Sequence, residues 1–197
     1  MKQDGVTLIE LVVVIAIIGI LVVALGFQFI GWRARYNVES EIKTMHIDLT
    51  TARQRAMQKN VQYVAVVPAV NGNNYRVCED TNGNNQCDST SETTGSSISQ
   101  SLSKNNLGYP VNSDLPGALI MNTKGMFMVV DGGAVSDIDN TAPNNIWLKN
   151  PDTGGFYGPS EVDYDCMSIS TTRIGLGKYD NDGNQTICKK LQSCCVK

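Results

Sequence analysis

A long apolar segment near the start of the sequence contains a single carboxylate. From residue 6 to residue 31 the only polar side chains are those of Thr7, Glu10 and Gln28. A helix of this length would rise about 39 Å, more than the roughly 30 Å hydrocarbon core of a bilayer. An acidic residue at mid-bilayer is disfavoured by roughly 2.5–3.5 kcal/mol. The segment contains no Lys or Arg, so Glu10 needs a cation from elsewhere.

A cut between Gly5 and Val6 would supply that cation as a free α-amine. The run GVTLIELVVVIAIIGIL resembles the N-terminal signal of type IV prepilins and type II secretion pseudopilins. This resemblance implies cleavage after Gly5 by the prepilin peptidase, N-methylation of Val6, and pairing of Glu10 with the N-terminal amine of a neighbouring subunit. Two features depart from the family pattern: Val6 stands where phenylalanine is usual, and Asp4 accompanies the one basic leader residue, Lys2.

Two more ordinary kinds of membrane segment fit these residues less well. A secretory signal has a shorter apolar run followed by a small-residue cleavage site, and nothing of that kind follows Leu25. A plain single-span anchor accounts for the hydrophobicity but gives no reason for Glu10. The expected location is the bacterial inner membrane, crossed once, with Lys2 on the cytoplasmic side and the C-terminal domain in the periplasm. After assembly we expect a cell-surface filament.

The remainder of the chain, about 165 residues, is enough for one domain with a single core. The net charge of −3 and the pI near 5.1 disfavour a general nucleic-acid binder, whose surface would be basic. All six cysteines lie beyond residue 77, on the side expected to be exported, where an even number is typical of disulfides. Spacing favours Cys78 with Cys87 and Cys166 with Cys188, and leaves the pairing of Cys194 and Cys195 open.

A second helical half follows the apolar segment. Apolar residues recur at steps of four and three, which places them on one helix face. No proline or helix-ending glycine interrupts residues 32–59, so we expect one continuous helix that stops at Asn60. The apolar positions are Val38, Ile42, Met45, Leu49, Ala52 and Ala56.

Beyond Asn60 short β-branched and apolar runs alternate with turn residues, which predicts strands. We expect an α+β fold in which the long N-terminal helix packs on an antiparallel β-sheet, with residues 79–117 as a long surface excursion. The expected organisation is a leader at 1–5, a transmembrane and assembly half of the helix at 6–33, an amphipathic half at 34–60, and a disulfide-bonded β domain at 61–197. Strands are expected at 63–67, 75–78, 118–121, 126–130, 146–148, 166–170 and 173–177.

Weaker matches extend the resemblance to minor pseudopilins of the GspH and FimT type. Residues 51–61, TARQRAMQKNV, are similar to the late-helix segment of that group, and residues 121–125 and 168–177 lie where it has a glycine-bearing strand pair. Phe27 stands where major pilins often carry a kinking proline, which favours a minor subunit. The resemblance implies a structural subunit that partners other pilin or pseudopilin subunits and is not an enzyme. The alternative is a filament-associated module that binds DNA, a surface or a secreted substrate.

Two Asx-rich loops space oxygen side chains in the manner of a calcium-binding loop. Both lack the acidic residue at the last ligand position, so an Asx-rich turn is the favoured interpretation. Calcium is the one cofactor that the sequence raises. The residues concerned are Asp80, Asn82, Asn84 and Asp88 in the first loop, and Asp180, Asp182 and Asn184 in the second.

Arg173 and Lys178 lie near the place where some FimT-type minor pilins carry a basic DNA-binding hairpin. Phosphate binding needs clustered cations, whereas here two acidic residues, Asp180 and Asp182, follow. The sequence therefore disfavours nucleic acid as a partner. It also offers no catalytic relay, because His46 is the only histidine and has no serine or cysteine in a suitable pattern beside it.

Overall fold

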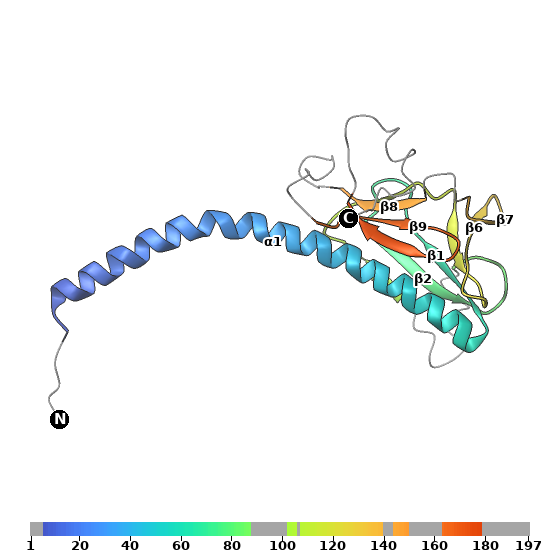
Figure 1. Ribbon diagram of the computed structural model, residues 1–197, viewed down its shortest axis with the longest axis horizontal. Coiled ribbons are helices and arrows are strands. Elements are labelled where there is room, and N and C mark those ends of the chain that lie inside the picture. The colour runs from blue at the N-terminus through green and yellow to red at the C-terminus, as the bar shows by residue number, and fades with distance from the viewer. Residues whose placement is uncertain (1–5, 88–101, 106, 140–143, 150–162, 179–197) are drawn as a thin grey trace, which may run out of the picture. The chain divides into compact units, whose positions relative to one another are not determined.

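The computed structural model describes residues 6–87, 102–105, 107–139, 144–149 and 163–178, and within them the side chains of 24–32, 34 and 102–105 are left undescribed. The chain divides into two compact units, Met1–Tyr36 and Asn37–Lys197. Helix α1, Leu8–Lys59, contributes residues to both, and the described strands β1 to β10 all belong to the second unit (Figure 1).

Helix α1 begins and ends at residues that favour a helix boundary. Thr7 directly precedes the first helical residue, and threonine is a preferred N-cap because its hydroxyl can bond a free N–H of the first turn. At the other end Asn60 has a φ of 55°, the left-handed conformation in which many helices stop. The predicted end of the helix at Asn60 is confirmed, as is its continuity across residues 32–59.

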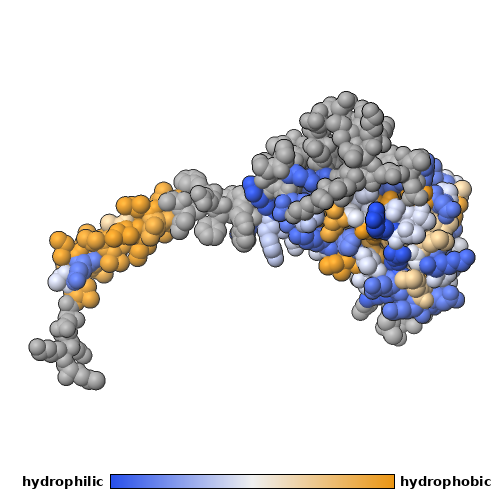
Figure 2. All heavy atoms as spheres, viewed as in Figure 1, coloured by the Kyte–Doolittle hydropathy of each residue, from blue (hydrophilic) through white to orange (hydrophobic). Residues whose placement is uncertain are grey.

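From Leu8 to Val23 the large apolar side chains of α1 are exposed. The large apolar residues between Val6 and Val23 keep 49–80% of their surface accessible, and they cover this part of the helix (Figure 2). Over the part of the chain that the structure describes, no helix is at once long enough and apolar enough to cross a membrane. The side chains of residues 24–32, inside the segment predicted to span a membrane, lie outside that part.

In the second unit α1 is amphipathic and its apolar face is completely buried. All six positions predicted from the periodicity, from Val38 to Ala56, are 0% exposed. They join one cluster with residues of both sheets, in which Tyr63, Tyr75 and Phe127 are among the largest buried side chains. Burying a large apolar side chain contributes roughly 1.5–3 kcal/mol, so this face fastens the helix to the strands.

The larger sheet has six antiparallel strands in the order β3-β2-β1-β5-β6-β7. Its central strand β1 pairs with β2 on one side and β5 on the other, with Val64 opposite both Cys78 and Ile120. The β6–β7 hairpin turns at Gly132 and Gly133, both with positive φ. The strands are β1 Gln62–Val66, β2 Asn74–Asp80, β3 Leu102–Asn105, β5 Ala118–Met121, β6 Phe127–Asp131 and β7 Ala134–Asp137.

The smaller sheet has four antiparallel strands in the order β10-β9-β8-β4. It is tied to the larger sheet by main-chain hydrogen bonds, from Phe127 N–H to the Thr171 carbonyl at 2.7 Å and between Gly72 and Val111. The strands are β4 Val111–Ser113, β8 Asn145–Leu148, β9 Cys166–Ile169 and β10 Ile174–Gly177.

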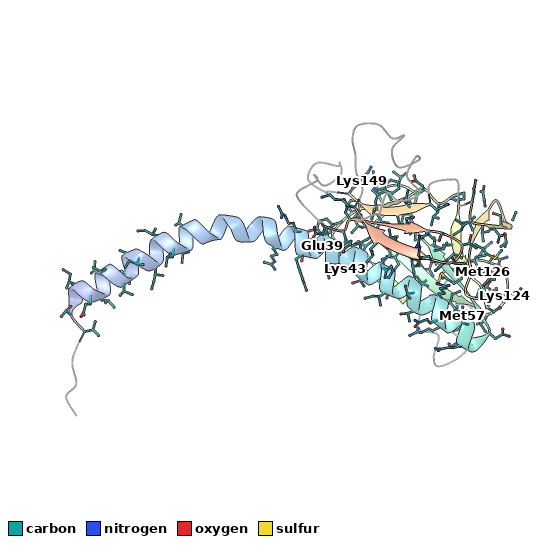
Figure 3. The ribbon with its side chains drawn as sticks, in the orientation of Figure 1. Glu39, Lys43, Met57, Lys124, Met126 and Lys149 are labelled. Atoms are coloured by element: carbon teal, nitrogen blue, oxygen red, sulfur yellow. A yellow bond between two sulfur atoms is a disulfide. The ribbon has the colours of Figure 1, made fainter. Side chains whose placement is uncertain are left out.

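The turn between β5 and β6 is fastened directly to α1. Arg53 Nε donates to the Gly125 carbonyl at 2.6 Å. Gly125 has a φ of 75°, and a Cβ at this position would lie 2.5 Å from Met57 Sδ. Figure 3 shows Met57 of the helix close to Lys124 and Met126 of the strand pair. The close approach explains why glycine occupies this position.

The expected α+β fold is confirmed, with a helix followed by antiparallel β structure. Two expectations were wrong in detail. The strands form two sheets where one was expected, and residues 79–117 are not simply a surface excursion, because β3 and β4 lie within them. Both strands are short and polar, and β4 pairs through its main chain while Asn112 and Ser113 are buried. Such strands carry no apolar alternation to reveal them.

Candidate functional site

The first turn of α1 holds Glu10 in a reciprocal set of hydrogen bonds with Thr7. The Thr7 N–H and the Thr7 hydroxyl both donate to Glu10 Oε2 at 2.9 Å. In return the Glu10 N–H donates to Thr7 Oγ1 at 3.3 Å. With Thr7 at the N-cap and Glu10 three residues later, this is the capping-box arrangement. The box fixes both the start of the helix and the direction of the Glu10 side chain.

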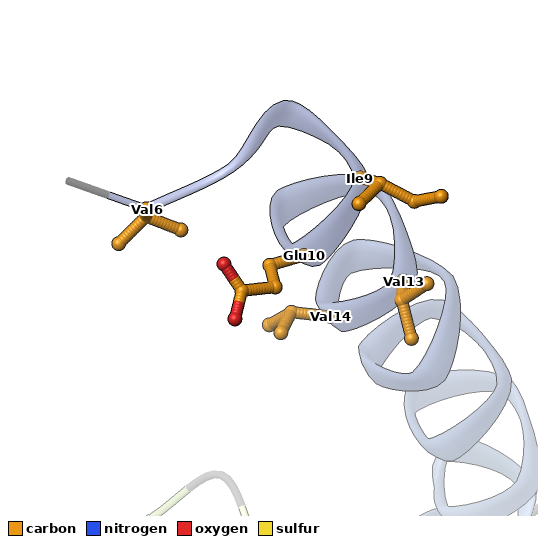
Figure 4. Close-up of a pocket in the computed structure, with 5 residues that line it drawn as sticks. All are labelled: Val6, Ile9, Glu10, Val13 and Val14. Atoms are coloured by element: carbon orange, nitrogen blue, oxygen red, sulfur yellow. The ribbon is translucent and has the colours of Figure 1, made fainter.

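The carboxylate lies in an open pocket whose other walls are apolar. Glu10 lines it with Val6, Ile9, Val13 and Val14, and Figure 4 shows the carboxylate between the side chains of Val6 and Val14. Oε2 holds both bonds from Thr7, whereas Oε1 accepts no hydrogen bond from any residue in the described ranges. The structure therefore brings two predicted site residues, Val6 and Glu10, to one pocket and leaves one carboxylate oxygen open.

Sequence reasoning missed the part that Thr7 plays. The pattern threonine-x-x-glutamate before an apolar run is itself the sequence signal of a capping box. This capping-box signal is overlooked when Glu10 is interpreted only as a charge that needs a cation from another chain. The hydroxyl and the N–H of Thr7 give the charge a local partner within its own chain.

A disulfide joins Cys78 of β2 to Cys87, the first pair that the spacing favours, with a Cα–Cα distance of 5.4 Å. Cys166 of β9 is also disulfide-bonded. Its expected partner Cys188, together with Cys194 and Cys195, lies outside the described residues.

The loop closed by the Cys78–Cys87 bond is organised around Asp80, which is 4% exposed. Asp80 Oδ1 accepts from the N–H groups of Gly83 and Asn84, at 2.7 and 3.2 Å. Oδ2 accepts from the Asn85 N–H at 3.0 Å and from Gln62 Nε2 at 2.7 Å. Both carboxylate oxygens are therefore occupied by donors of the chain itself.

The amides of the same loop also accept main-chain bonds. Asn82 Oδ1 accepts from the Asn84 N–H at 3.0 Å, and Asn84 Oδ1 accepts from the Gln86 N–H at 2.9 Å. These are Asx turns, the interpretation favoured from the sequence. Among the described residues no group of three or more His, Cys, Asp or Glu is placed to hold a metal ion. Asp88, Asp180, Asp182 and Asn184 lie outside those residues, so calcium stays the alternative to the favoured Asx-rich turn.

Arg173 and Lys178, the residues considered for DNA, flank β10 at its two ends. The four residues of β10 lie between them, and five steps of extended strand separate the two by about 16 Å. The two cations are therefore spread along one strand, whereas a phosphate-binding patch would group them.

Two clusters of titratable groups in the second unit fasten α1 to β1 and β2. Lys59 Nζ bonds Glu79 Oε2 at 2.7 Å, and the Tyr63 hydroxyl donates to the same oxygen at 2.7 Å. Burial alone would raise the pKa of Glu79, but the bonds from Lys59 and Tyr63 outweigh it and the pKa lies below its ordinary value. Burial, together with the bond that the hydroxyl donates to Asp48, raises the pKa of Tyr75. Each of these side chains bonds another side chain of the same unit, as expected of contacts that stabilise a fold.

Comparison with known proteins addresses the first turn of α1. A family model for the prokaryotic N-terminal methylation motif matches residues 1–26, which include Gly5, Val6, Thr7 and Glu10. Searches of curated proteins and of solved structures with this chain gave no match. The matched motif is that of a family of structural proteins, whose precursors are anchored in the membrane, processed by a prepilin peptidase and assembled with other subunits. Over its first 26 residues the chain thus carries the N-terminal methylation motif that is characteristic of type IV pilins and pseudopilins.

Proposed function

We propose that this chain is a minor pilin or pseudopilin. As a structural subunit it is cleaved after Gly5, N-methylated on Val6, and then incorporated into a type IV pilus or a type II secretion pseudopilus, or initiates one. The observation that carries this proposal is the Glu10 carboxylate, held by Thr7 through one oxygen while the other stays open, in a segment whose large apolar side chains are exposed as far as Val23.

The exposed apolar surface between Val6 and Val23 favours burial, but it does not determine whether lipid or a neighbouring helix covers it. Lipid tails and neighbouring helices are similarly apolar, so the hydrophobic effect gives little preference between bilayer and filament. A specific polar contact must supply that preference. A carboxylate in an apolar pocket supplies it, because an amine brought to Glu10 relieves the cost of a charge that packed helices of a filament would otherwise surround with hydrocarbon.

The capping box is compatible with such a contact. Cleavage after Gly5 removes neither Thr7 nor its N–H, so both bonds to Oε2 can persist in the mature chain. A neighbouring subunit's α-amine can then bond Oε1, and the carboxylate would accept three hydrogen bonds. In this role Thr7 is a positioning residue that directs Oε1 away from its own helix.

The absence of a kinking residue supports a minor subunit. Phe27 occupies the place where major pilins often have a proline, and α1 continues through it without interruption. A helix without proline keeps its i to i−4 bonds at this position. The chain therefore presents a continuous helix for packing.

The test compares three variants of the full chain. Glu10→Val should enter the membrane fraction but fail to join sheared filaments, because an apolar side chain cannot bond the amine. Glu10→Asp keeps the charge and should retain part of the incorporation, while Ile15→Val is a matched apolar control that should assemble normally. Normal incorporation of Glu10→Val would refute the proposal, as would native filaments whose N-terminal peptide still begins at Met1 by mass spectrometry.

A further inference from the structure

Two arginines follow the apolar part of α1 in the first unit. Arg33 and Arg35 are exposed, and Tyr36 next to them is 63% exposed. No Asp or Glu occurs between residues 11 and 38. Neither arginine makes a hydrogen bond or ion pair within the described residues. At the end of the long apolar run, two guanidinium groups are therefore available to bind an anion from outside the chain.

The positions of the arginines on the helix indicate what kind of anion that is. With 3.6 residues per turn, two positions two residues apart point about 200° away from each other. Arg33 and Arg35 thus lie on opposite sides of α1. A protein partner packed on one face of the helix would meet only one of them, whereas lipid headgroups surround an embedded helix on every side.

We propose that Arg33 and Arg35 bind the phosphate groups of anionic phospholipids and so set the axial position of α1 in the bilayer. The proposal rests on the membrane-anchored state of the proposed function. Arginine suits this ligand, because its guanidinium keeps its charge and can bond two phosphate oxygens at once. Trp32 and Tyr36 are residue types enriched at the same depth of a membrane.

The axial position matters for Glu10. Residues 10 and 33 are separated by about 35 Å along a helix that rises about 1.5 Å per residue, slightly more than a hydrocarbon core of about 30 Å. With the arginines among the headgroups of one leaflet, Glu10 lies at the opposite interface, where water can reach its carboxylate. The arginines therefore keep the assembly residue near the surface until a neighbouring amine replaces that water.

Lipid preference can be measured next to the arginines with the full chain reconstituted in vesicles. Trp32 serves as the reporter in a Trp147→Phe background, since Trp147 lies in β8 and would obscure the signal. Its fluorescence is quenched by brominated phosphatidylglycerol or brominated phosphatidylcholine, and the ratio of the two gives the preference for the anionic lipid. Only protein that floats with the vesicles is read, so a variant that fails to insert is not counted.

The wild-type chain should prefer phosphatidylglycerol, and each change of Arg33→Gln or Arg35→Gln should reduce the preference by up to about fivefold, the factor expected for one basic residue at an anionic surface. The two glutamine changes combined should leave almost none. Arg33→Lys combined with Arg35→Lys should retain most of the preference, and Lys124→Gln, which changes an exposed cation of the second unit (Figure 3), should retain all of it. An unchanged ratio when both arginines are replaced by glutamine, or an equal loss in Lys124→Gln, would overturn the proposal.

The experiments distinguish a failure of the lipid proposal from a failure of the proposed function. Glu10→Val should keep the full lipid preference even though it does not assemble. If Glu10→Val assembles normally, the proposed function is wrong whatever the lipid ratio. If the wild-type chain shows no lipid preference yet is cleaved and incorporated, the lipid proposal alone is wrong.

Discussion

Similar apolar side chains differ completely in their exposure between the two parts of helix α1. In the first unit the large apolar residues from Val6 to Val23 keep 49–80% of their surface exposed, whereas the six apolar positions from Val38 to Ala56 keep none. The first part is apolar on every side, and the second has one apolar face. Strands of the same unit cover the apolar residues of the second part, whereas those of the first part form an exposed apolar surface of the kind that marks an interaction site.

Two carboxylates show the same contrast in polar chemistry. Asp80 in the second unit fills both oxygens with four donors of its own chain. Glu10 in the first unit bonds Thr7 through Oε2 alone. A buried polar group needs hydrogen-bond partners, and Asp80 finds them within its own chain. Asp80 is therefore a structural residue. Glu10 is suited to receive a partner.

The largest effect should come from truncating matched isoleucines in the two parts. Ile42→Ala removes a fully buried side chain and should lower the free energy of unfolding by about 2–5 kcal/mol. Ile15→Ala, at a position that is 59% exposed, should leave the unfolding of the second unit unchanged. Denaturant titration in detergent, followed by Trp147 fluorescence in a Trp32→Phe background, measures both. Equal losses in the two variants would mean that the first part of α1 also stabilises the β structure.

The contrast also explains how much of the molecule could be predicted from the sequence. The buried face of α1 was predicted residue by residue because a helix repeats its apolar positions every 3.6 residues. Its end was predicted because Asn60 readily adopts a left-handed conformation. β7 was missed, since all four of its residues are exposed. The division into two sheets was missed too, because it depends on pairing between segments distant in sequence, such as β4 with β8, where Val111 lies opposite Leu148.

For the candidate site, the charge of Glu10 in an apolar run was enough to identify it. The bonds from Thr7 were missed, although a threonine three residues before a glutamate at the start of an apolar run is the sequence signal of a capping box. Three of the four donors around Asp80 are main-chain N–H groups of the Asx-rich turn that the sequence favoured. The fourth, Gln62, could not have been predicted, since it comes from a strand eighteen residues away. Local patterns therefore show which groups need partners, and tertiary contacts decide whether the chain itself supplies them.

Removing the Cys78–Cys87 disulfide should have the next largest effect, and only in the second unit. A loop of this size is expected to contribute about 2–3 kcal/mol by restricting the unfolded chain. The double change Cys78→Ser and Cys87→Ser should therefore lower the denaturant midpoint, while membrane association through the first unit stays the same. A single Cys87→Ser variant serves as a control for the loss of the bond alone. An unchanged midpoint would show that the hydrogen bonds of Asp80 already hold the loop.

The contact of Lys59 with Glu79 predicts a small effect that depends on pH. The pKa of Glu79 lies below its ordinary value of about 4.5 in the folded chain, so this group adds stability above that value and loses it as the pH falls through the folded pKa. Lys59→Met should remove about 0.5–1 kcal/mol at pH 7, and less and less as the pH falls through the folded pKa of Glu79. Thermal unfolding of both chains over a series of acidic pH values measures the difference. A loss that stays the same at every pH would mean that the lysine acts through its hydrocarbon stem.

The smallest effect expected is that of calcium on the second unit. Because both oxygens of Asp80 already accept two hydrogen bonds each, a metal would have to break bonds of the loop before it could bind there. Millimolar calcium and a chelator should therefore give the same melting temperature. Asp80→Asn makes the comparison sharper, since it removes the charge and one acceptor: it should lower the melting temperature equally with and without calcium. A rise with calcium in the wild-type chain that disappears in Asp80→Asn would show that this loop binds calcium.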